Sequence, residues 1–353
     1  MKTVPMYLLT VVCLALACSR PARNELKPEL AVWPVPVEVR IQTGAFLRGP
    51  ADSVIRLTGL AGEALSAQVA VRGSQDIRAL RGELSALNGT AGAAIADCRV
   101  RYGGYLPVDE TQSLTADPLL ETDSVDVPAN TAQPVWITVM LPRDAKAGVY
   151  RSELRLSARS HAPASLPLVV EVLPAALPEP PDWSFYLNIW QDPSAVARAH
   201  KVKVWSEEHW KILERYAANY AAHGMKAVMI HIIHDPWDSV RGLADDTFVE
   251  WQYPGEFQPG AAEKFTWDFM VFDRYVQMML NAGVREKIDM YALVMGPGSS
   301  TKADIRYLDT STGQHRNLAL NVGDPLWKEV WIAFLPVLRE HLKEKGWFGR
   351  AML

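Results

Sequence analysis

Residues 226–234 read KAVMIHIIH, a nearly unbroken apolar run with the length of one β-strand. Runs of this kind are typical of strands buried on both faces, as in parallel sheets. The preceding residues are helical in period: Ser206 is a suitable N-cap, the apolar positions from Trp210 to Ala221 fall on one face, and Gly224 ends the helix. The region therefore predicts a helix that leads into a buried parallel strand.

The same helix–strand unit recurs on both sides of this run. Ser184 to Trp190 and residues 288–294 read as further strands, and a helical pattern between Asp268 and Gly283 precedes the second of them. Asp324-Pro325 opens another helix, with proline at its first position. The residues Ala351-Met352-Leu353 read as the start of a fourth strand.

Strands that alternate with helices predict parallel pairing, in either a doubly wound sheet or a (β/α)8 barrel of the TIM type. A complete barrel needs about 250 residues, more than residues 183–353 provide. We therefore expect an incomplete (β/α)8 barrel, with three βα units and the start of strand four, in a fragment of a longer protein.

Residues 35–173 alternate with period two instead. Clear examples are residues 37–41, 67–71, 135–141 and 153–156. This pattern predicts an antiparallel β-sandwich, to which we assign a structural role. The following residues 174–182, PAALPEPPD, contain four prolines and predict an extended linker before the barrel region 183–353.

The first 18 residues have the features of an export signal. Lys2 precedes an apolar stretch from Val4 to Ala17 that is too short to span a bilayer. The sequence Ala15-Leu16-Ala17-Cys18-Ser19 resembles a bacterial lipoprotein cleavage site with Cys18 as the lipidated residue; ordinary cleavage after Ala17 is the alternative. Residues 19–34 would then be a tether. We expect an exported protein of the cell envelope, in the outer membrane or periplasm, that touches the membrane through its lipid anchor only.

Composition argues against several other classes of function. The net charge is -4 and there is no basic run, which argues against nucleic-acid binding. Gly296-Pro297-Gly298 lacks the spacing and the lysine of a phosphate-binding loop, and we expect no cofactor. His231 and His234 lie three residues apart in a strand without an identifiable third ligand, so we expect no metal.

Several side chains suited to sugar binding follow the ends of the predicted strands. Parallel strands place their carboxyl ends at one edge, where these side chains would meet. Aromatic rings can stack on sugar faces, and carboxylates and imidazoles can bind hydroxyls. The candidates are Trp190, Asp192, His234, Asp235, Trp237 and Tyr291. Alternatively, Asp192-Pro193 and Asp235-Pro236 simply begin turns. His231 is expected to be a core residue.

Six stretches resemble glycoside hydrolase family 123, an assignment that covers most of the chain from Trp33 to Leu353. They are QPVWITVMLPRDAKAGVYRSEL (133–154), WSFYLNIWQDPSAVARAHKVKVWSEEHW (183–210), MIHIIHDPW (229–237), FTWDFMVFDRYVQMML (265–280), KIDMYALV (287–294) and HLKEKGWF (341–348).

The resemblance implies an exo-acting β-N-acetylgalactosaminidase with a sandwich and a barrel, whose partner is a glycan ending in N-acetylhexosamine. It also implies retaining, substrate-assisted hydrolysis by an Asp-Glu pair at the end of strand four. The Asp holds the 2-acetamido group and the Glu is the acid and base. No residue of this chain matches the pair, which we expect just beyond Leu353. The chain alone would then be inactive.

Two questions stay open from the sequence. Where the family pattern has Pro-Trp after strand three, this chain has Met295-Gly296, so the preference for galacto or gluco sugars is not decided. The alternative function is a non-catalytic cell-surface glycan-binding lipoprotein, which would use the sandwich and the aromatic residues to hold sugar.

Overall fold

The computed structural model describes residues 28–45, 54–89, 93–108, 113–234, 247–291, 293 and 302–353. The predicted residues Cys18, Asp235 and Trp237 lie outside these ranges. Contacts divide the chain into two units, with the boundary between Leu177 and Pro178. No helix in the described ranges is both long and apolar enough to cross a membrane.

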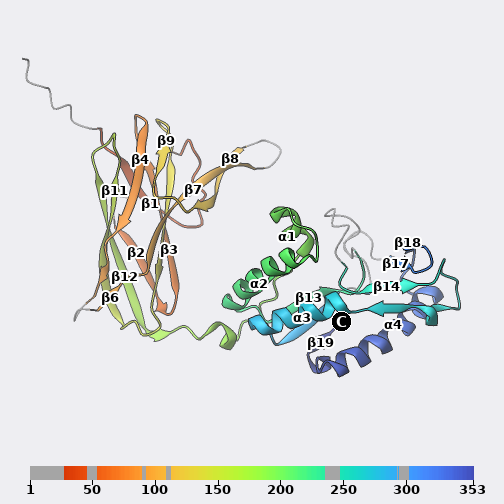
Figure 1. Ribbon diagram of the computed structural model, residues 1–353. Helices are drawn as coiled ribbons and strands as arrows, with labels where there is room; N and C mark the ends of the chain where they lie inside the picture. The colour runs from red at the N-terminus through yellow and green to blue at the C-terminus, as the bar shows by residue number, and fades with distance from the viewer. Residues whose placement is uncertain are drawn as a thin grey trace, which may run out of the picture. The chain divides into compact units, whose positions relative to one another are not determined.

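The first unit consists of two β-sheets (Figure 1). One sheet has the order β1 (Ala31–Val35), β3 (Ala64–Arg72), β10 (Gln133–Met140), β7 (Cys98–Val108) and β8 (Ser113–Leu120). The other has the order β2 (Ile55–Ala61), β12 (Ala164–Ala176), β11 (Gly148–Ser157), β4 (Ile77–Leu84) and β9 (Val125–Val127), with β5 (Leu87–Asn88) and β6 (Ala94–Ile95) beside β11.

Alternating side chains from both sheets meet in one core. Val69 and Ile137 from the first sheet and Leu154 and Leu168 from the second are fully buried in the same cluster. The predicted alternation at 67–71, 135–141 and 153–156 thus falls largely within β3, β10 and β11. Neighbouring strands are antiparallel except β2 and β12, which pair in parallel.

One predicted strand of this unit is wrong. Residues 37–41 are not a strand: β1 ends at Val35, and a turn follows in which the amide of Val39 donates to the carbonyl of Pro36 over 3.0 Å. The side-chain amide of Gln68 donates to the carbonyls of Pro36 and Val39, both over 2.9 Å. These bonds stabilise the turn and outweigh the local alternation.

The proline-rich segment is shorter than predicted at its start. Strand β12 runs to Ala176, which pairs with Ala61. A short 3-10 helix, η2 (Pro180–Asp182), begins the second unit instead of a fully extended spacer. The missing amide hydrogens of Pro180 and Pro181 cost nothing in the first turn of a helix.

The second unit contains the predicted parallel strands. Strand β13 (Ala227–His231) pairs with β16 (Lys287–Tyr291), which pairs with β19 (Ala351–Met352), all in parallel. The predicted strand at Ser184–Trp190 is reduced to one parallel bridge between Leu187 and Met225, next to β13. The spatial order therefore follows the chain order, with no reversal of direction across the sheet.

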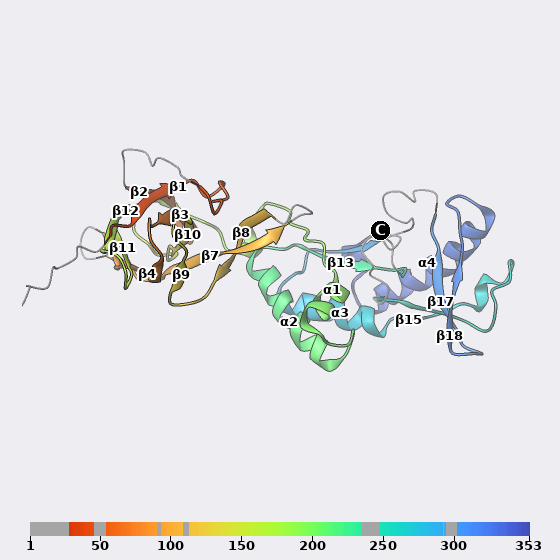
Figure 2. The same cartoon turned by 90° about the horizontal axis from the view of Figure 1, so that it is seen from above.

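Four α-helices accompany these strands: α1 (Pro193–His200), α2 (Glu207–Ala222), α3 (Met270–Ala282) and α4 (Pro325–Glu344). Helices α2 and α3 lie side by side in both ribbon views (Figures 1 and 2). Ser206 caps α2 as predicted, with its hydroxyl accepting from the amide of His209 over 3.3 Å. The short 3-10 helices η3 (Ala262–Lys264) and η4 (Phe348–Arg350) complete the unit.

A second sheet in this unit was not predicted. Its order is β15 (Thr266–Asp268), β14 (Glu250–Tyr253), β17 (Ile305–Asp309) and β18 (Gln314–Leu318). The two segments that supply it follow β13 and β16 in the chain. One face is aromatic and buried: Trp251 lies 4.5 Å from the ring of Phe334 in α4, and Tyr253 lies 4.9 Å from Phe265. The high tryptophan content after residue 183 is thus used largely for packing.

The two faces of the parallel sheet have different environments. Val228, Ile230 and Ile288 belong to the large core that also includes the helices. The residues that alternate with these along β13 and β16 point to the opposite face of the sheet, as strand alternation requires. Met229 and Tyr291 form a separate small cluster on this second face, which also carries Asp289. The second face positions the candidate site.

Candidate functional site

The second face of the parallel sheet carries a small hydrogen-bonded group. The carboxylate of Asp289 in β16 accepts from the amide nitrogen of Asn188 over 2.5 Å and from the hydroxyl of Tyr186 over 3.3 Å, both to Oδ2. The other oxygen, Oδ1, is buried, as is Oδ1 of Asn188, and neither has a partner among the described residues. Buried acceptors without donors are unusual, so this group can take further donors.

An aromatic pair lies at the end of the same face. The rings of Trp190 and Tyr291 have centroids 5.6 Å apart and are inclined by 54°. Trp190 is 52% exposed, so a large part of its ring is open to solvent. Tyr291 is the last residue of β16 and packs on Met229. The structure thus brings together two of the predicted site residues.

Asp192, another of the predicted site residues, caps a helix. Its Oδ1 accepts from the amide of Ala195 over 2.9 Å and from the hydroxyl of Ser194 over 3.2 Å, which makes it the N-cap of α1. Pro193 occupies the first helical position. The Asp-Pro signal that predicts the start of α4 at Asp324-Pro325 also occurs at Asp192-Pro193, where it marks the start of α1.

His234 faces the unpredicted sheet. A guanidinium nitrogen of Arg306 in β17 donates to its Nε2 over 2.7 Å. Because arginine has no acceptor, this nitrogen of His234 carries no proton. A cavity of about 190 Å³ is lined here by His234, Thr247, Glu250, Arg306 and His315. Nε2 of His315 lies 3.1 Å from Oε1 of Glu250.

Four residues of this cavity, Thr247, Glu250, Arg306 and His315, were not predicted from the sequence. Glu250, Arg306 and His315 lie within strands of the second sheet rather than at the ends of the parallel strands. The only available signal was the alternation Ile305-Arg306-Tyr307-Leu308-Asp309. It indicates a strand with one polar face, but not what that face meets.

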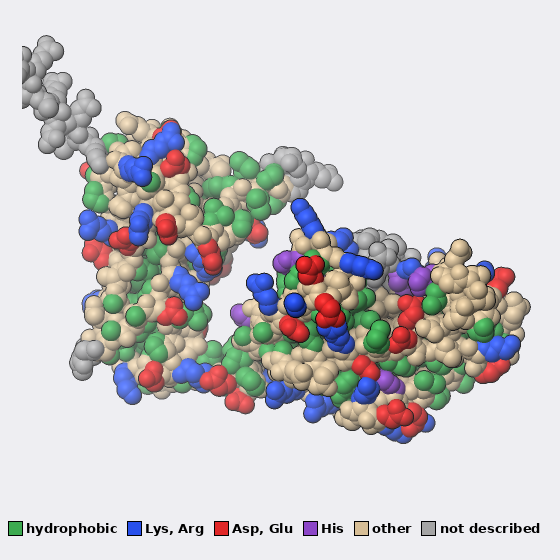
Figure 3. Space-filling model, in the orientation of Figure 1, with side chains coloured by type: hydrophobic (Ala, Val, Ile, Leu, Met, Phe, Trp, Pro, Cys, Tyr) green, Lys and Arg blue, Asp and Glu red, His purple; other side chains and the backbone are tan. Residues whose placement is uncertain are grey.

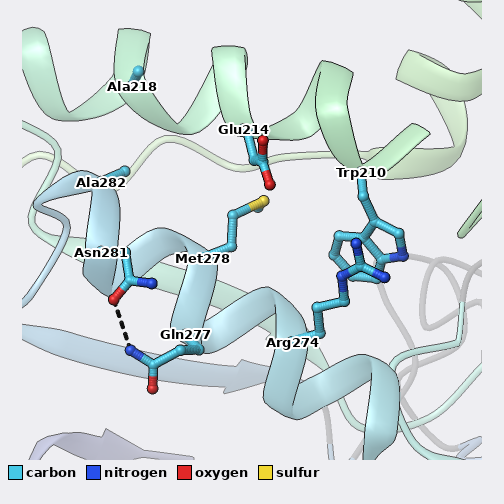
Figure 4. A pocket seen from close by; sticks show the side chains of 8 residues that line it. All are labelled: Trp210, Glu214, Ala218, Arg274, Gln277, Met278, Asn281 and Ala282. Atoms are coloured by element: carbon cyan, nitrogen blue, oxygen red, sulfur yellow. Dashed lines mark hydrogen bonds between the residues drawn. The ribbon is translucent and has the colours of Figure 1, made fainter. Parts of the chain in front are cut away.

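A larger cavity, of about 510 Å³, lies between α2 and α3 (Figure 4). The guanidinium of Arg274 lies 4.5 Å above the ring of Trp210 and is bonded to both carboxylate oxygens of Glu207, over 2.5 and 2.8 Å. The lining comes from helix side chains and includes no residue at a strand end. We therefore place the candidate site at the strand ends instead.

The remaining predictions concern histidine and metal. His231 is buried at 2% exposure, and its ring meets Phe248 edge to face at 5.7 Å, as expected for a core residue. Throughout the described ranges, no group of three or more His, Cys, Asp or Glu side chains could hold a metal ion.

Two family models match this chain. The glycoside hydrolase 123 N-terminal domain matches residues 47–158, and the glycoside hydrolase 123 catalytic domain matches residues 190–353. Together they identify both units, and the chain belongs to glycoside hydrolase family 123.

One solved structure shares the fold of this chain over most of its length. A family 123 glycoside hydrolase from Clostridium perfringens, studied for glycolipid glycan hydrolysis, matches with a TM-score of 0.79 and 20% identity over 92% of this chain. This chain spans 58% of the length of that one. The fimbrial subunit MyfA from Yersinia enterocolitica matches 41% of this chain and 98% of its own, at 10% identity and a TM-score of 0.22, too low to carry an argument. No curated protein matches the chain significantly.

Proposed function

We propose that the protein is an exported glycoside hydrolase that removes terminal β-linked N-acetylgalactosamine by retaining, substrate-assisted hydrolysis. The observation that carries the proposal is the match of residues 190–353 to the family's catalytic domain, combined with the aromatic pair Trp190 and Tyr291 beside the group around Asp289. Ring faces for stacking and a carboxylate acceptor are the groups that a sugar site needs.

The order of the parallel strands favours the interpretation of this unit as the first part of a (β/α)8 barrel. Leu187, β13, β16 and β19 lie in chain order, as consecutive barrel strands do, whereas a doubly wound sheet reverses its order at a switch point. In this proposal the second face of the sheet becomes the barrel interior. The sugar then binds at the carboxyl ends of the strands.

The proposed chemistry needs an Asp-Glu pair at the end of strand four, the place of β19. Residues 183–353 contain no adjacent Asp-Glu, and the proposal assigns the pair to residues that follow Leu353 in the full-length protein. The 2-acetamido oxygen attacks the anomeric carbon as the glycosidic oxygen takes a proton from the Glu and departs. Water, deprotonated by the same Glu, then attacks the anomeric carbon, which opens the oxazolinium ring and restores the acetamide.

Within this scheme the described residues bind and orient the sugar. Trp190 and Tyr291 present ring surface to the sugar face. Asp289, two residues before Tyr291 in β16, accepts hydrogen bonds from Asn188 and Tyr186 and holds them in place. His234 contributes from the end of β13, where Arg306 fixes its orientation.

The experiment that tests the proposal uses the full-length protein and 4-nitrophenyl β-N-acetylgalactosaminide. We expect hydrolysis with the β-anomer as first product by NMR, and a large fall in kcat/KM when a trifluoroacetamido group, a poorer nucleophile, replaces the acetamido group. Comparison with the N-acetylglucosaminide decides between galacto and gluco preference. Binding of N-acetylgalactosamine without hydrolysis would instead support the alternative, a surface glycan-binding lipoprotein.

A further inference from the structure

The second sheet of the catalytic unit has one polar face. In β14 and β17 the residues Trp251, Tyr253, Ile305 and Tyr307 are buried, so the residues between them point to the opposite side. We call this side the polar sheet face; it comprises Glu250, Gln252, Arg306, His315 and Asn317. Arg306 is opposite Asn317, and Leu308, which lies on the same face, is opposite both Gln252 and His315. Nε2 of His315 lies 3.1 Å from Oε1 of Glu250, which brings Glu250 into the same group.

The polar sheet face adjoins the ends of the parallel strands. Both segments that build the sheet follow a parallel strand, one after β13 and one after β16. The hydrogen bond from Arg306 to Nε2 of His234, 2.7 Å long, ties β17 to the residues directly after β13. Figure 3 shows histidine side chains at the surface in the region of β17 and β18. In barrel folds, chemistry takes place on this side of the strands.

The cavity on this face has the composition of a site for a neutral polar ligand. Its lining combines a guanidinium, two imidazoles and the carboxylate of Glu250, so it contains both hydrogen-bond donors and acceptors. A site for an anion would carry an excess of positive groups, which the carboxylate of Glu250 opposes. At about 190 Å³ the cavity is smaller than the roughly 300–1,000 Å³ of pockets that take drug-sized ligands. Its size suits one sugar ring.

We propose that this cavity binds the sugar residue next to the one that is removed, on the leaving-group side of the glycan. The inference rests on the proposed function. An enzyme that removes a terminal sugar has no further sugar on the non-reducing side, so any additional sugar must belong to the leaving group. Glu250, Arg306 and His315 thereby select which glycans are hydrolysed.

The test compares two substrates of the full-length protein. 4-Nitrophenyl β-N-acetylgalactosaminide has no second sugar, whereas N-acetylgalactosamine β-linked to galactose through O3 or O4 has one. The variants are Glu250→Gln and His315→Ala, and the control is Gln314→Ala. Gln314 is exposed in the same hairpin but lies outside the cavity.

We expect the ratio of kcat/KM for the disaccharides to that for the nitrophenyl glycoside to fall at least tenfold in both variants. In the control the ratio should stay within twofold of the parent. An unchanged ratio in Glu250→Gln and His315→Ala, with thermal unfolding curves like the parent's, would overturn the inference.

The inference and the proposed function fail in different ways. If the parent protein hydrolyses neither substrate, the proposed function is overturned, and the cavity is tested by calorimetric titration with the same disaccharides. Weaker binding in Glu250→Gln than in Gln314→Ala supports the cavity as a sugar site. Equal affinity in the two variants rejects it.

Discussion

The guanidinium of Arg306 donates a 2.7 Å hydrogen bond to Nε2 of His234, and so joins a hairpin of the second sheet to the residues that follow the buried strand β13. The two residues are 72 positions apart in the chain. His234 was a predicted site residue, and Arg306 was not. Their contact means that the second sheet takes part in shaping the candidate site.

Energetic coupling between these two residues is the first prediction. In urea unfolding of the full-length protein, His234→Ala and Arg306→Ala should be non-additive, with a coupling free energy of roughly 0.5–3 kcal/mol, as for residues in direct contact. His234→Ala should also lower kcat/KM while the protein stays folded. Additive effects on stability would show that the hydrogen bond contributes nothing, and loss of the thermal transition would mark His234 as structural.

Trp190→Ala should weaken the binding of N-acetylgalactosamine. Loss of a ring that stacks on a sugar face costs about 0.5–1.5 kcal/mol, taking aromatic pairs as the guide. This corresponds to a roughly two- to tenfold rise in Kd, measurable by calorimetry. Phe185→Ala is the matched control, because Phe185 is 67% exposed in the same segment. Equal effects of the two substitutions would exclude a specific role for Trp190.

Asp309→Asn should destabilise the second sheet in a pH-dependent way. The Asp309 carboxylate accepts from the Ser311 hydroxyl over 2.6 Å, from Nε of Arg316 over 2.8 Å and from the Gly255 amide over 2.9 Å. These donors, the Ser311 hydroxyl above all, hold the pKa of Asp309 far below its ordinary value of 3.8.

The lowered pKa of Asp309 determines how its contribution to stability changes with pH. The stabilisation by the Asp309 carboxylate is fully present above the unfolded-state pKa near 3.8 and is lost as the pH falls toward the lower folded-state pKa. The melting temperature of Asp309→Asn should therefore lie below the parent's at pH 7, and the difference should shrink below pH 3.8. A difference that does not change between pH 7 and pH 2 would contradict this account.

Alanine substitutions at two glycines distinguish the cost of backbone strain from the cost of side-chain crowding. Gly224 and Gly260 both have positive φ, at +77° and +84°. A Cβ on Gly260 would meet nothing within 4 Å, whereas one on Gly224 would lie 2.6 Å from Cε3 of Trp183. Gly260→Ala should cost about 1–2 kcal/mol for the left-handed conformation alone. Gly224→Ala should cost about 1–3 kcal/mol more, because the ring must move. Equal losses in urea unfolding would show that Trp183 relaxes freely.

Cys18→Ala tests the proposed lipid anchor. If Cys18 carries the lipid, the variant should move from the membrane fraction to the soluble fraction after cell lysis. Ser19→Ala is a suitable control, because it leaves the modified thiol in place. Continued membrane association of Cys18→Ala would refute lipidation at this residue.

The sequence by itself determined the buried strands β13 and β16, the start of β19 and the helices α2, α3 and α4. These elements depend on local periodicity, on caps such as Ser206, and on turn residues such as Gly224 and Gly283. Each of these signals lies within a few residues of the element it defines. The placement of Trp190 beside Tyr291 followed in turn, because parallel strands bring their carboxyl ends to one edge.

Only the tertiary structure decided the second sheet, the cap at Asp192 and the turn after Val35. Strands β14 and β17 are four and five residues long, and their pairing joins segments separated by some 50 residues. The stability of such strands comes from aromatic packing against α4, which no local pattern encodes. The Arg306–His234 contact depends on that pairing, and the cavity beside it could therefore be found only in the folded chain.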